Sequence, residues 1–340
     1  MKSAVILIPS YEPDENLIRI VETLKDNGYP ILVVNDGSNP TFNNVFEKAK
    51  ESAFVLSYDN NRGKGFALKY GYSKIPELFP EAKYVITVDG DGQHSIKDIN
   101  RIYDKLCETN KIVLGVRTFD KNTPPKSKFG NDASKFTRSW LTKQYLPDDQ
   151  CGLRGFPVEY IPELIKMKGN RYNYEMSQLV KLQLMHVELV KLPIETIYIE
   201  QNNGTHFAPF KDTMRIQSLI FAHGISAIIC SLILMALMIL SYRFSGLPSF
   251  ATIYLSYLIS TVLYIVLTII IYPVKSILRC IGTEGASMIF RMLLCHLILW
   301  IFVDSLGWNY FIMIPIAVFI TSFFNVLYAY IISKIKILNK

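Results

Sequence analysis

Charged residues are almost absent from the last third of this 340-residue chain. Of its 65 Asp, Glu, Lys and Arg residues, only six lie between Leu219 and Ser333. Four apolar stretches fill that region, near residues 219–241, 250–273, 287–306 and 310–333. A helix rises about 1.5 Å per residue, so about 20 apolar residues cross the hydrocarbon core of a bilayer. The region is therefore predicted to be an all-α membrane domain of four transmembrane helices.

The flanking cations predict how these helices are oriented. The third stretch, which holds Arg291, His296 and Asp304, is the weakest of the four, but four crossings would place both chain ends on one side. Lys and Arg residues gather on that side, at positions 211, 215, 275, 279, 291, 334, 336 and 340. The opposite loops offer only Arg243. By the positive-inside rule, the chain is expected to be a multi-pass membrane protein with its soluble part and both termini in the cytoplasm.

The net charge of +7 does not indicate a nucleic-acid-binding surface. From Leu219 to the end, seven Lys and Arg residues face two Asp and Glu residues, which gives +5 for the membrane part and leaves +2 for the first 218 residues. The positive charge is thus explained by membrane topology rather than by a basic patch, and no nucleic-acid partner is expected.

Short apolar runs alternate with helical patterns in the first half of the chain. Strands are predicted at 4–9, 31–36, 53–58, 84–89 and 112–116, and helices at 14–28, 41–51, 65–75 and 96–108. This order predicts an α/β domain with a mainly parallel sheet and helices on both faces. Ligands of such sheets bind beyond the carboxyl ends of the strands, where Asp36, Asp89 and Arg117 fall.

The segment VDGDGQH carries the first candidate site. Asp89, Asp91 and Gln93 stand at alternate positions just after an apolar run. Residues two apart in an extended chain point to the same side, and the glycines between them allow the backbone to turn. Magnesium and manganese are commonly held by one or two carboxylates together with substrate phosphates. The segment therefore predicts a metal site, with a solvated Asp-Gly turn as the alternative.

Two other segments place polar groups at the same edge. In VVNDGSNP, Asp36 either accepts hydrogen bonds from a base or ribose, or serves as a turn or helix cap. In DNNRGKGFALKYG, Arg62 and Lys64 stand between glycines at a helix start, which suits a phosphate or a base. Neither G-x-G-x-x-G nor a P-loop is present, so dinucleotide and ATP binding lack their usual motifs.

These motifs resemble those of glycosyltransferase family 2, specifically the polyprenyl-phosphate type that includes dolichol-phosphate mannose synthase. The similar segments are IPSYEPDENL, VVNDGSNP, NRGKGFALKYG, TVDGDGQH, GVR, SKFGN, DDQCGLRGF and NGTHFAPFKDTMRI, which run in order over roughly residues 4–218. The last helices resemble the four-span GtrA-like membrane domain. The resemblance implies a GT-A fold, a nucleotide-sugar donor, a polyprenyl phosphate acceptor and Mg²⁺ or Mn²⁺ as cofactor.

The resemblance also implies roles for individual residues. The donor nucleotide would be bound by Pro9, Tyr11, Glu12, Asp36, Asp59, Lys64 and Asp89. The metal would be held by Asp89, Asp91 and Gln93. The acceptor phosphate would be bound by Arg117, Lys126, Ser127 and Lys128. The catalytic group would comprise Asp89, Asp91, Arg117, Asp148, Gln150 and Arg154.

Two positions depart from the family pattern. Many relatives have Asn-Glu after the tyrosine where this chain has Glu12 and Pro13, and many have arginine where it has Lys128. Lysine lacks the bidentate fork of arginine, so the phosphate contacts near Ser127 would differ. His94 follows Gln93 in the turn and is interpreted as a metal-proximal or structural residue rather than as a general base.

The predicted domains are a cytosolic GT-A domain at 1–204, an interfacial segment at 205–218, the membrane domain at 219–333 and a basic tail at 334–340. The expected reaction is inverting transfer of a hexose from a donor such as UDP-glucose or GDP-mannose to undecaprenyl or dolichyl phosphate, for assembly of the cell envelope or of a glycan. A processive polysaccharide synthase is one alternative, although its Q-x-x-R-W motif is missing. A lipid-linked sugar flippase with a non-catalytic binding domain is another. The sequence leaves the sugar open, and a homo-oligomer remains an open expectation.

Overall fold

The computed structural model describes residues 1–117, 135, 138–139, 142, 144–148, 151–195, 225–244, 249–271 and 277–338. The chain divides into two compact units, each considered by itself. The first comprises residues 1–131, 148–179 and 188–216. The second comprises residues 132–147, 180–187 and 217–340. The expected boundary segment at 205–218 and residues 339–340 of the expected basic tail lie outside the described residues.

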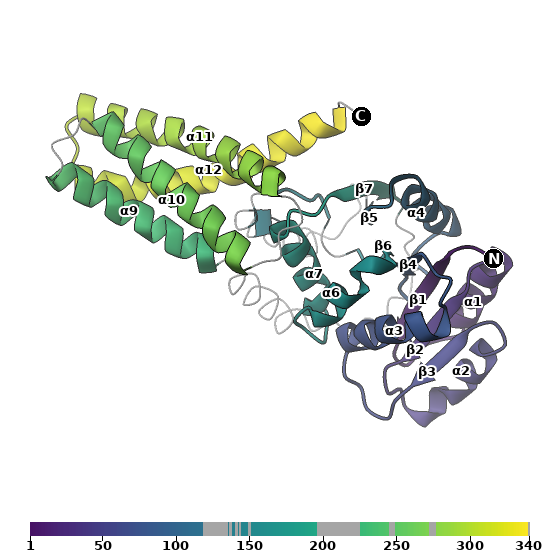
Figure 1. Cartoon of the computed structure of the whole chain (residues 1–340). Coiled ribbons are helices and arrows are strands. Elements are labelled where there is room, and N and C mark those ends of the chain that lie inside the picture. Colours follow the sequence, from purple (N-terminus) through teal and green to yellow (C-terminus); the bar gives the residue numbers. More distant parts are fainter. Residues whose placement is uncertain are drawn as a thin grey trace. The chain divides into compact units, whose positions relative to one another are not determined.

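The first unit contains a seven-stranded sheet with the order β3-β2-β1-β4-β6-β5-β7 (Figure 1). Its strands are β1 (Ala4–Ser10), β2 (Ile31–Asn35), β3 (Phe54–Ser57), β4 (Tyr84–Thr87), β5 (Ile112–Arg117), β6 (Arg154–Pro157) and β7 (Leu189–Ile194). The pairs β1–β2, β1–β4, β2–β3 and β5–β7 are parallel, whereas β6 is antiparallel to β4 and to β5. The predicted α/β domain with a mainly parallel sheet is therefore confirmed.

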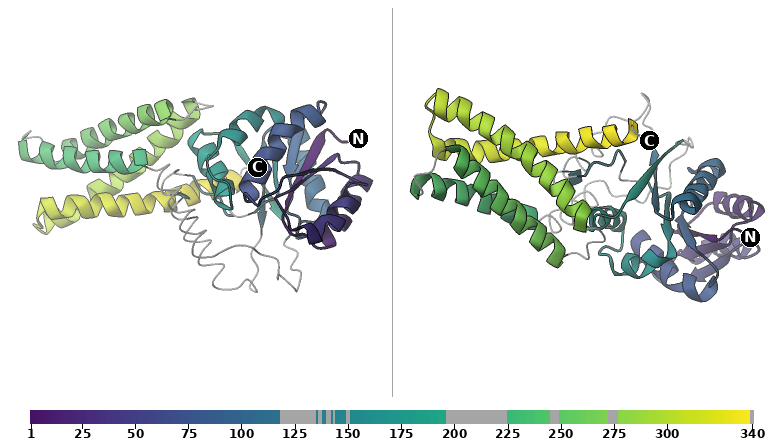
Figure 2. Two further views of the ribbon diagram at one scale, coloured as in Figure 1. Left: turned by 90° about the horizontal axis from the view of Figure 1, so that it is seen from below. Right: turned by 45° about the horizontal axis from the view of Figure 1, so that its top comes forward.

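Helices cover both faces of this sheet (Figure 2). They are α1 (Asn16–Asp26), α2 (Asn43–Ala49), α3 (Lys64–Leu78), α4 (Ile96–Thr109), α6 (Ile161–Lys166) and α7 (Asn173–Leu184), with 3₁₀ turns η1 (Pro40–Phe42) and η2 (Val158–Tyr160). On one face, apolar residues of α1, α2 and α4 pack with alternate strand residues such as Ile6 and Val33 in a single core. Helix α3 packs on the other face, against β1 and β2. Strands β1, β2, β4 and β5 are buried almost throughout, and they are accordingly almost continuous apolar runs.

The strand directions bring one end of each of five strands to the same edge. Strands β1, β2, β4 and β5 end there, and the antiparallel β6 begins there at Arg154. The turn after β4 is held in place at its far end by α4, where Ser95 accepts a 3.0 Å hydrogen bond from the Asp98 N–H. The buried Asp98 carboxylate accepts in turn from Ser95 Oγ and from Arg101. These caps position the segment between β4 and α4 that contains the candidate acidic motif.

The second unit is dominated by four helices that run alongside one another (Figures 1 and 2). They are α9 (Ile225–Phe244), α10 (Ser249–Ile271), α11 (Ile277–Leu299) and α12 (Tyr310–Leu338), with a π-helical turn η3 (Trp300–Ser305) after α11. Two helical segments, Phe250–Ile270 and Cys280–Ser305, are long and apolar enough to cross a membrane by length and composition. The apolar parts of the other two helices, Ile229–Phe244 and Tyr310–Phe324, are shorter. The expected domain of four transmembrane helices is thus supported for two of them.

The helical bundle buries polar side chains beside an apolar core and exposes many large apolar side chains. Thr252, Ser256, Glu284, Ser287 and Thr321 are each at most 1% exposed. A buried apolar cluster drawn from α9, α10, α11 and α12 lies in the same bundle. Among the described residues, every large exposed apolar side chain except Met1 and Phe54 lies between Ile229 and Ile331. An exterior so rich in apolar side chains departs from the usual pattern of a water-soluble bundle.

Candidate functional site

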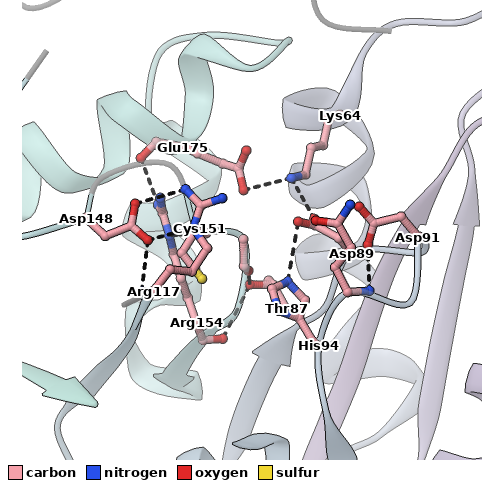
Figure 3. Close-up of polar contacts among 12 residues, drawn as sticks. Lys64, Thr87, Asp89, Asp91, His94, Arg117, Asp148, Cys151, Arg154 and Glu175 are labelled. Atoms are coloured by element: carbon pink, nitrogen blue, oxygen red, sulfur yellow. Dashed lines mark hydrogen bonds and ion pairs between the residues drawn. The ribbon is translucent and has the colours of Figure 1, made fainter. Parts of the chain in front are cut away.

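The candidate site lies at the edge of the sheet where β1, β2, β4 and β5 end. Asp89 follows β4 after Val88, Asp36 follows β2 directly, and Arg117 is the last residue of β5. Residues 151–153 lead into β6, which begins at the same edge. Figure 3 shows the side chains that meet there. The expectation that these strand ends lie at one edge is therefore correct.

Asp89 is paired with a lysine from the start of α3. Lys64 Nζ is 2.7 Å from Asp89 Oδ1 and 2.9 Å from Glu175 Oε1, so one ammonium group bridges two carboxylates (Figure 3). Burial opposes the charge on Lys64, but the two carboxylates outweigh this effect and raise its pKa. Burial likewise opposes the charge on Asp89, but Lys64 and His94 lower its pKa below the ordinary value. Both members of the pair are therefore ionised.

Asp91 is less enclosed than Asp89 and makes a local contact. Its Oδ1 accepts a 3.1 Å hydrogen bond from the N–H of Gln93. Burial, and then the charge of Asp89, raise the pKa of Asp91 above its ordinary value. A raised pKa beside a second carboxylate means that the local negative charge is incompletely compensated, so a cation would be stabilised there.

These residues fit a divalent cation that shares its coordination with a substrate. Across the described part of the chain, no cluster of three or more His, Cys, Asp or Glu residues could hold a metal ion alone. Asp89 and Asp91 are two carboxylates in the same turn, which is the number that Mg²⁺ usually takes from a protein when phosphates complete its shell. The predicted metal ligands Asp89, Asp91 and Gln93 remain a prediction that this geometry permits.

His94 lies beside Asp89 and is largely shielded from solvent. Its Nε2 is 3.5 Å from Asp89 Oδ2, and its side chain is 6% exposed. Beyond this contact, neither ring nitrogen has a hydrogen-bond partner among the described residues. This position is compatible with the interpretation of His94 as a metal-proximal or structural residue.

Asp36 anchors the loop that precedes α3. Its carboxylate accepts hydrogen bonds from Tyr58 Oη at 2.8 Å, from the Arg62 N–H at 2.8 Å and from the Gly63 N–H at 2.8 Å. Burial, followed by the hydrogen bond to Asp36, raises the pKa of Tyr58. The two oxygens of Asp36 thus serve mainly to fix the loop that carries Lys64. These contacts give Asp36 a structural role in this loop, and its predicted contact with the donor nucleotide stays a prediction.

Gly63 allows α3 to begin where it does. Its φ is 97°, in the region that favours glycine, and an added Cβ would lie 2.5 Å from the carbonyl oxygen of Asn170. The other residues predicted to line the donor site lie near this loop or at the end of β1. Pro9 is in β1, the N–H of Glu12 donates to Ser38 Oγ at 2.8 Å, and Asp59 is exposed. The donor roles of Pro9, Tyr11, Glu12 and Asp59 stay predictions.

Arg117 and Asp148 form a bidentate ion pair. Arg117 Nε and Nη2 are 2.8 and 3.0 Å from the two carboxylate oxygens of Asp148, and the Arg117 N–H donates to Asp148 Oδ2 at 3.1 Å. The Asp148 side chain is 0% exposed, whereas that of Arg117 is 23% exposed. Burial opposes the charge on Arg117, but the contact with Asp148 raises its pKa. Asp148 therefore orients Arg117, and the guanidinium remains partly open to solvent.

Arg154 is buried among carbonyl groups. Its Nε donates to the Cys151 carbonyl at 2.9 Å, and its Nη1 donates to the Glu175 carbonyl at 2.8 Å and to Gln178 Oε1 at 3.0 Å. These bonds join the segment before β6 to helix α7. The predicted contact of Arg154 with sugar or acceptor stays a prediction, and the described contacts are structural.

Sequence reasoning missed two residues that shape the site. Glu175 shares Lys64 with Asp89, and Gly152 packs against the Asp89 carboxylate. Gly152 stands in the DDQCGLRGF segment and could have been noted there, but Glu175 lies in NYEMSQL, which matches no motif used above. Four predicted site residues lie outside the described residues: Lys126, Ser127, Lys128 and Gln150.

Comparisons with known proteins identify a family and several relatives of the chain. The model of the family described as glycosyl transferase family 2 matches residues 5–164. An uncharacterized protein of Methanocaldococcus jannaschii is 30% identical over 210 residues, which are 59% of this chain and 85% of that protein. The UDP-N-acetylglucosamine–dolichyl-phosphate N-acetylglucosaminyltransferase of Methanococcus voltae is 27% identical over 224 residues, 58% of this chain and 87% of that enzyme. One similar solved structure is that of glucosyl-3-phosphoglycerate synthase from Mycobacterium tuberculosis in complex with Mn²⁺, UDP and glucosyl-3-phosphoglycerate. The two align with a TM-score of 0.49 and 11% identity, over 66% of this chain and 80% of that one.

Proposed function

Because the chain belongs to glycosyl transferase family 2, we propose that it transfers a hexose, with inversion, from a nucleotide sugar to a polyprenyl phosphate. The proposed acceptor follows the relative from Methanococcus voltae, whose name specifies a dolichyl phosphate acceptor. The observation that carries the proposal is the charged cluster at the strand ends, in which Asp89, Asp91 and Lys64 meet at one edge. That cluster suits the diphosphate of a nucleotide sugar.

The acceptor in this proposal needs little activation. A phosphate monoester has a second pKa near about 6, so a lipid monophosphate is largely dianionic at neutral pH and is already a nucleophile. The enzyme must mainly bring two anions together and stabilise the leaving diphosphate. The described site provides cations for this purpose in Lys64 and Arg117, and its buried Asp148 is committed to Arg117. A strong general base is not required.

Asp89 and Asp91 would hold Mg²⁺ or Mn²⁺, with Gln93 next to them. When bound, the cation would neutralise charge on the leaving diphosphate. Lys64 would lie on the other side of Asp89, at the start of α3, where it and nearby backbone N–H groups favour a phosphate. Arg117, held by Asp148, would face the acceptor phosphate through the part of its guanidinium that remains exposed.

We propose that the second unit is a multi-pass membrane domain that holds this acceptor near the catalytic domain. Its apolar exterior and the polar side chains buried inside it support the proposal, because polar side chains within a membrane face the bundle interior. Glu284, which is 1% exposed, follows that rule. Alkaline extraction of membranes from expressing cells tests it: the full chain should stay with the lipid, and release into the supernatant would contradict the proposal.

The sugar stays open in this proposal. The relative from Methanococcus voltae is named for N-acetylglucosamine, and the sequence is compatible with UDP-N-acetylglucosamine as well as with UDP-glucose and GDP-mannose. The test uses full-length protein in liposomes with undecaprenyl or dolichyl phosphate and a panel of radiolabelled nucleotide sugars. Label should pass into the lipid phase with one donor and only when the lipid phosphate is present. A polymer that grows without lipid phosphate would favour the processive synthase. Movement of preformed lipid-linked sugar without any transfer would favour the flippase.

A further inference from the structure

Lys64 lies between two carboxylates that come from separate parts of the first unit. Asp89 follows β4 and Glu175 belongs to the first turn of α7, while Lys64 is the first residue of α3. The Lys64 Nζ is within 3 Å of both, at 2.7 Å from Asp89 and 2.9 Å from Glu175 (Figure 3). The side chains of Lys64 and Glu175 are only 19% and 11% exposed. The contacts are therefore shielded from the solvent screening that weakens surface ion pairs.

The oxygen that Lys64 contacts belongs to a proposed ligand of the divalent cation. An ammonium group and a divalent cation repel each other, and both are attracted to the Asp89 carboxylate. A cation bound at Asp89 would therefore weaken the contact between Lys64 and Asp89. Glu175 then offers Lys64 a second partner that is already within hydrogen-bond distance. Without that partner, the displaced lysine would be a poorly compensated, largely buried charge.

We propose that Lys64 is a built-in counter-ion that competes with the divalent cation for Asp89, and that Glu175 is the positioning residue that retains Lys64 when the cation binds. This inference rests on the proposed function, because it takes Asp89 to be a cation ligand. In the cation-free protein, Lys64 keeps the Asp89 carboxylate in place. In the loaded protein, Glu175 keeps the positive charge of Lys64 at the start of α3, beside the proposed site of the donor diphosphate.

Loss of the charge of Lys64 and loss of the charge of Glu175 should have opposite effects on the affinity for the cation. Removing the charge of Lys64 leaves Asp89 and Glu175 without their shared ammonium, so a divalent cation should bind more tightly even though transfer falls. Removing the charge of Glu175 commits Lys64 to Asp89, so the cation should bind more weakly.

The experiment is a Mn²⁺ titration by calorimetry on full-length protein in detergent at pH 8, without nucleotide. Relative to wild type, we expect Lys64→Met to bind Mn²⁺ about tenfold more tightly and Glu175→Gln about tenfold more weakly, given the strength of charge interactions at a few ångströms. Lys69→Met is the matched control, because Lys69 lies on the same helix but its Nζ contacts Asn170 Oδ1 at 2.7 Å. It removes the same charge without touching Asp89 and should leave the affinity unchanged.

Equal Mn²⁺ affinity in wild type and Lys64→Met would overturn the inference and leave the proposed metal site intact. Because nucleotide phosphates would complete the shell of the proposed cation, the titrations are repeated with UDP or GDP present. Absence of Mn²⁺ binding in all four proteins under both conditions would overturn the metal site and, with it, the inference. Thermal melts establish that each variant is folded. If Lys64→Met does not fold, Glu175→Gln decides alone, since it changes charge with little change of shape. Unchanged or tighter binding by that variant would refute the role assigned to Glu175.

Discussion

The Cα of Gly152 lies directly against the carboxylate of Asp89. A Cβ built on this glycine would fall 2.5 Å from Asp89 Oδ1 and 2.7 Å from Asp89 Cγ, distances that real Cβ atoms do not show. The segment around Gly152 is itself fixed, because Thr87 Oγ1 donates a 2.7 Å hydrogen bond to the Gly152 carbonyl. The absence of a side chain at Gly152 thus determines where the Asp89 carboxylate can lie.

Gly152→Ala should therefore displace the Asp89 carboxylate and reduce transfer by about a hundredfold, since a shift of about 1 Å in a catalytic group can have that effect. The matched control is Gly90→Ala in the DGDG motif itself, where an added Cβ would meet nothing closer than Ile8 Cγ2 at 3.5 Å. Initial rates and Mn²⁺ affinity should fall in Gly152→Ala and stay near wild type in Gly90→Ala. A larger loss in Gly90→Ala than in Gly152→Ala would show that Gly90, and not Gly152, positions the Asp89 carboxylate.

Asp91→Asn should abolish transfer while the protein still folds. The only hydrogen bond described for the Asp91 carboxylate is with the neighbouring N–H of Gln93, so its charge has little role in stability. Loss of one of two carboxylates should weaken Mn²⁺ binding about tenfold or more. Excess chelator should stop the wild-type reaction, and added Mg²⁺ or Mn²⁺ should restore it. Full turnover of wild type in chelator would remove the metal from the mechanism.

Arg117→Ala should lower both activity and stability, because it removes the guanidinium that is paired with the fully buried Asp148 carboxylate. Breaking a buried ion pair in this way costs about 3 kcal/mol or more in the free energy of unfolding. The double variant Arg117→Met with Asp148→Leu separates the two effects. Its stability should return close to that of wild type, since apolar residues often replace a buried pair at little cost. Its transfer rate should stay low if the guanidinium binds the acceptor phosphate, and recovery of the rate would contradict that role.

Tyr58→Phe tests the loop that Asp36 anchors. The Tyr58 hydroxyl donates to Asp36 at 2.8 Å, and a hydrogen bond to a charged group contributes about 1.5–3 kcal/mol. The pKa of Tyr58 is raised in the folded protein, so its contribution is complete below the ordinary tyrosine pKa of about 10 and is lost as the pH rises above it. Melting temperatures measured at pH 8, 9.5 and 11 should therefore show a large difference between wild type and Tyr58→Phe at pH 8 and a smaller one at pH 11. A constant difference would mean that Tyr58 is not buried against Asp36.

Much of the first unit could be predicted from local patterns. The five predicted strands and four predicted helices correspond to β1–β5 and α1–α4, with ends that differ by a few residues. Apolar runs and turn residues report burial along a single element, which is why they were sufficient there. The antiparallel β6 was not predicted. It is a short strand that begins at Arg154 and lies between two strands, β4 and β5, that precede it in the chain. Only its pairing with those strands identifies it.

The candidate site was predicted in part. The sequence placed Asp36, Asp89 and Arg117 at the ends of strands, because those positions follow from periodicity. It could not show which groups the carboxylates of the site contact. Asp36 fixes the loop before α3, and Asp148 is committed to Arg117. Both uses depend on hydrogen-bond partners from other parts of the chain.

The amino-acid sequence by itself determined that the chain has an α/β part followed by an apolar helical part. It also determined the order of strands and helices in the first part and the acidic turn after β4. These features depend on the side chains of neighbouring residues and on their spacing. Only the tertiary structure decided that Lys64 lies between Asp89 and Glu175 and that Gly152 packs on Asp89. The physical reason is that the order of strands in the sheet, set by packing over the whole core, brings together residues that no local pattern connects.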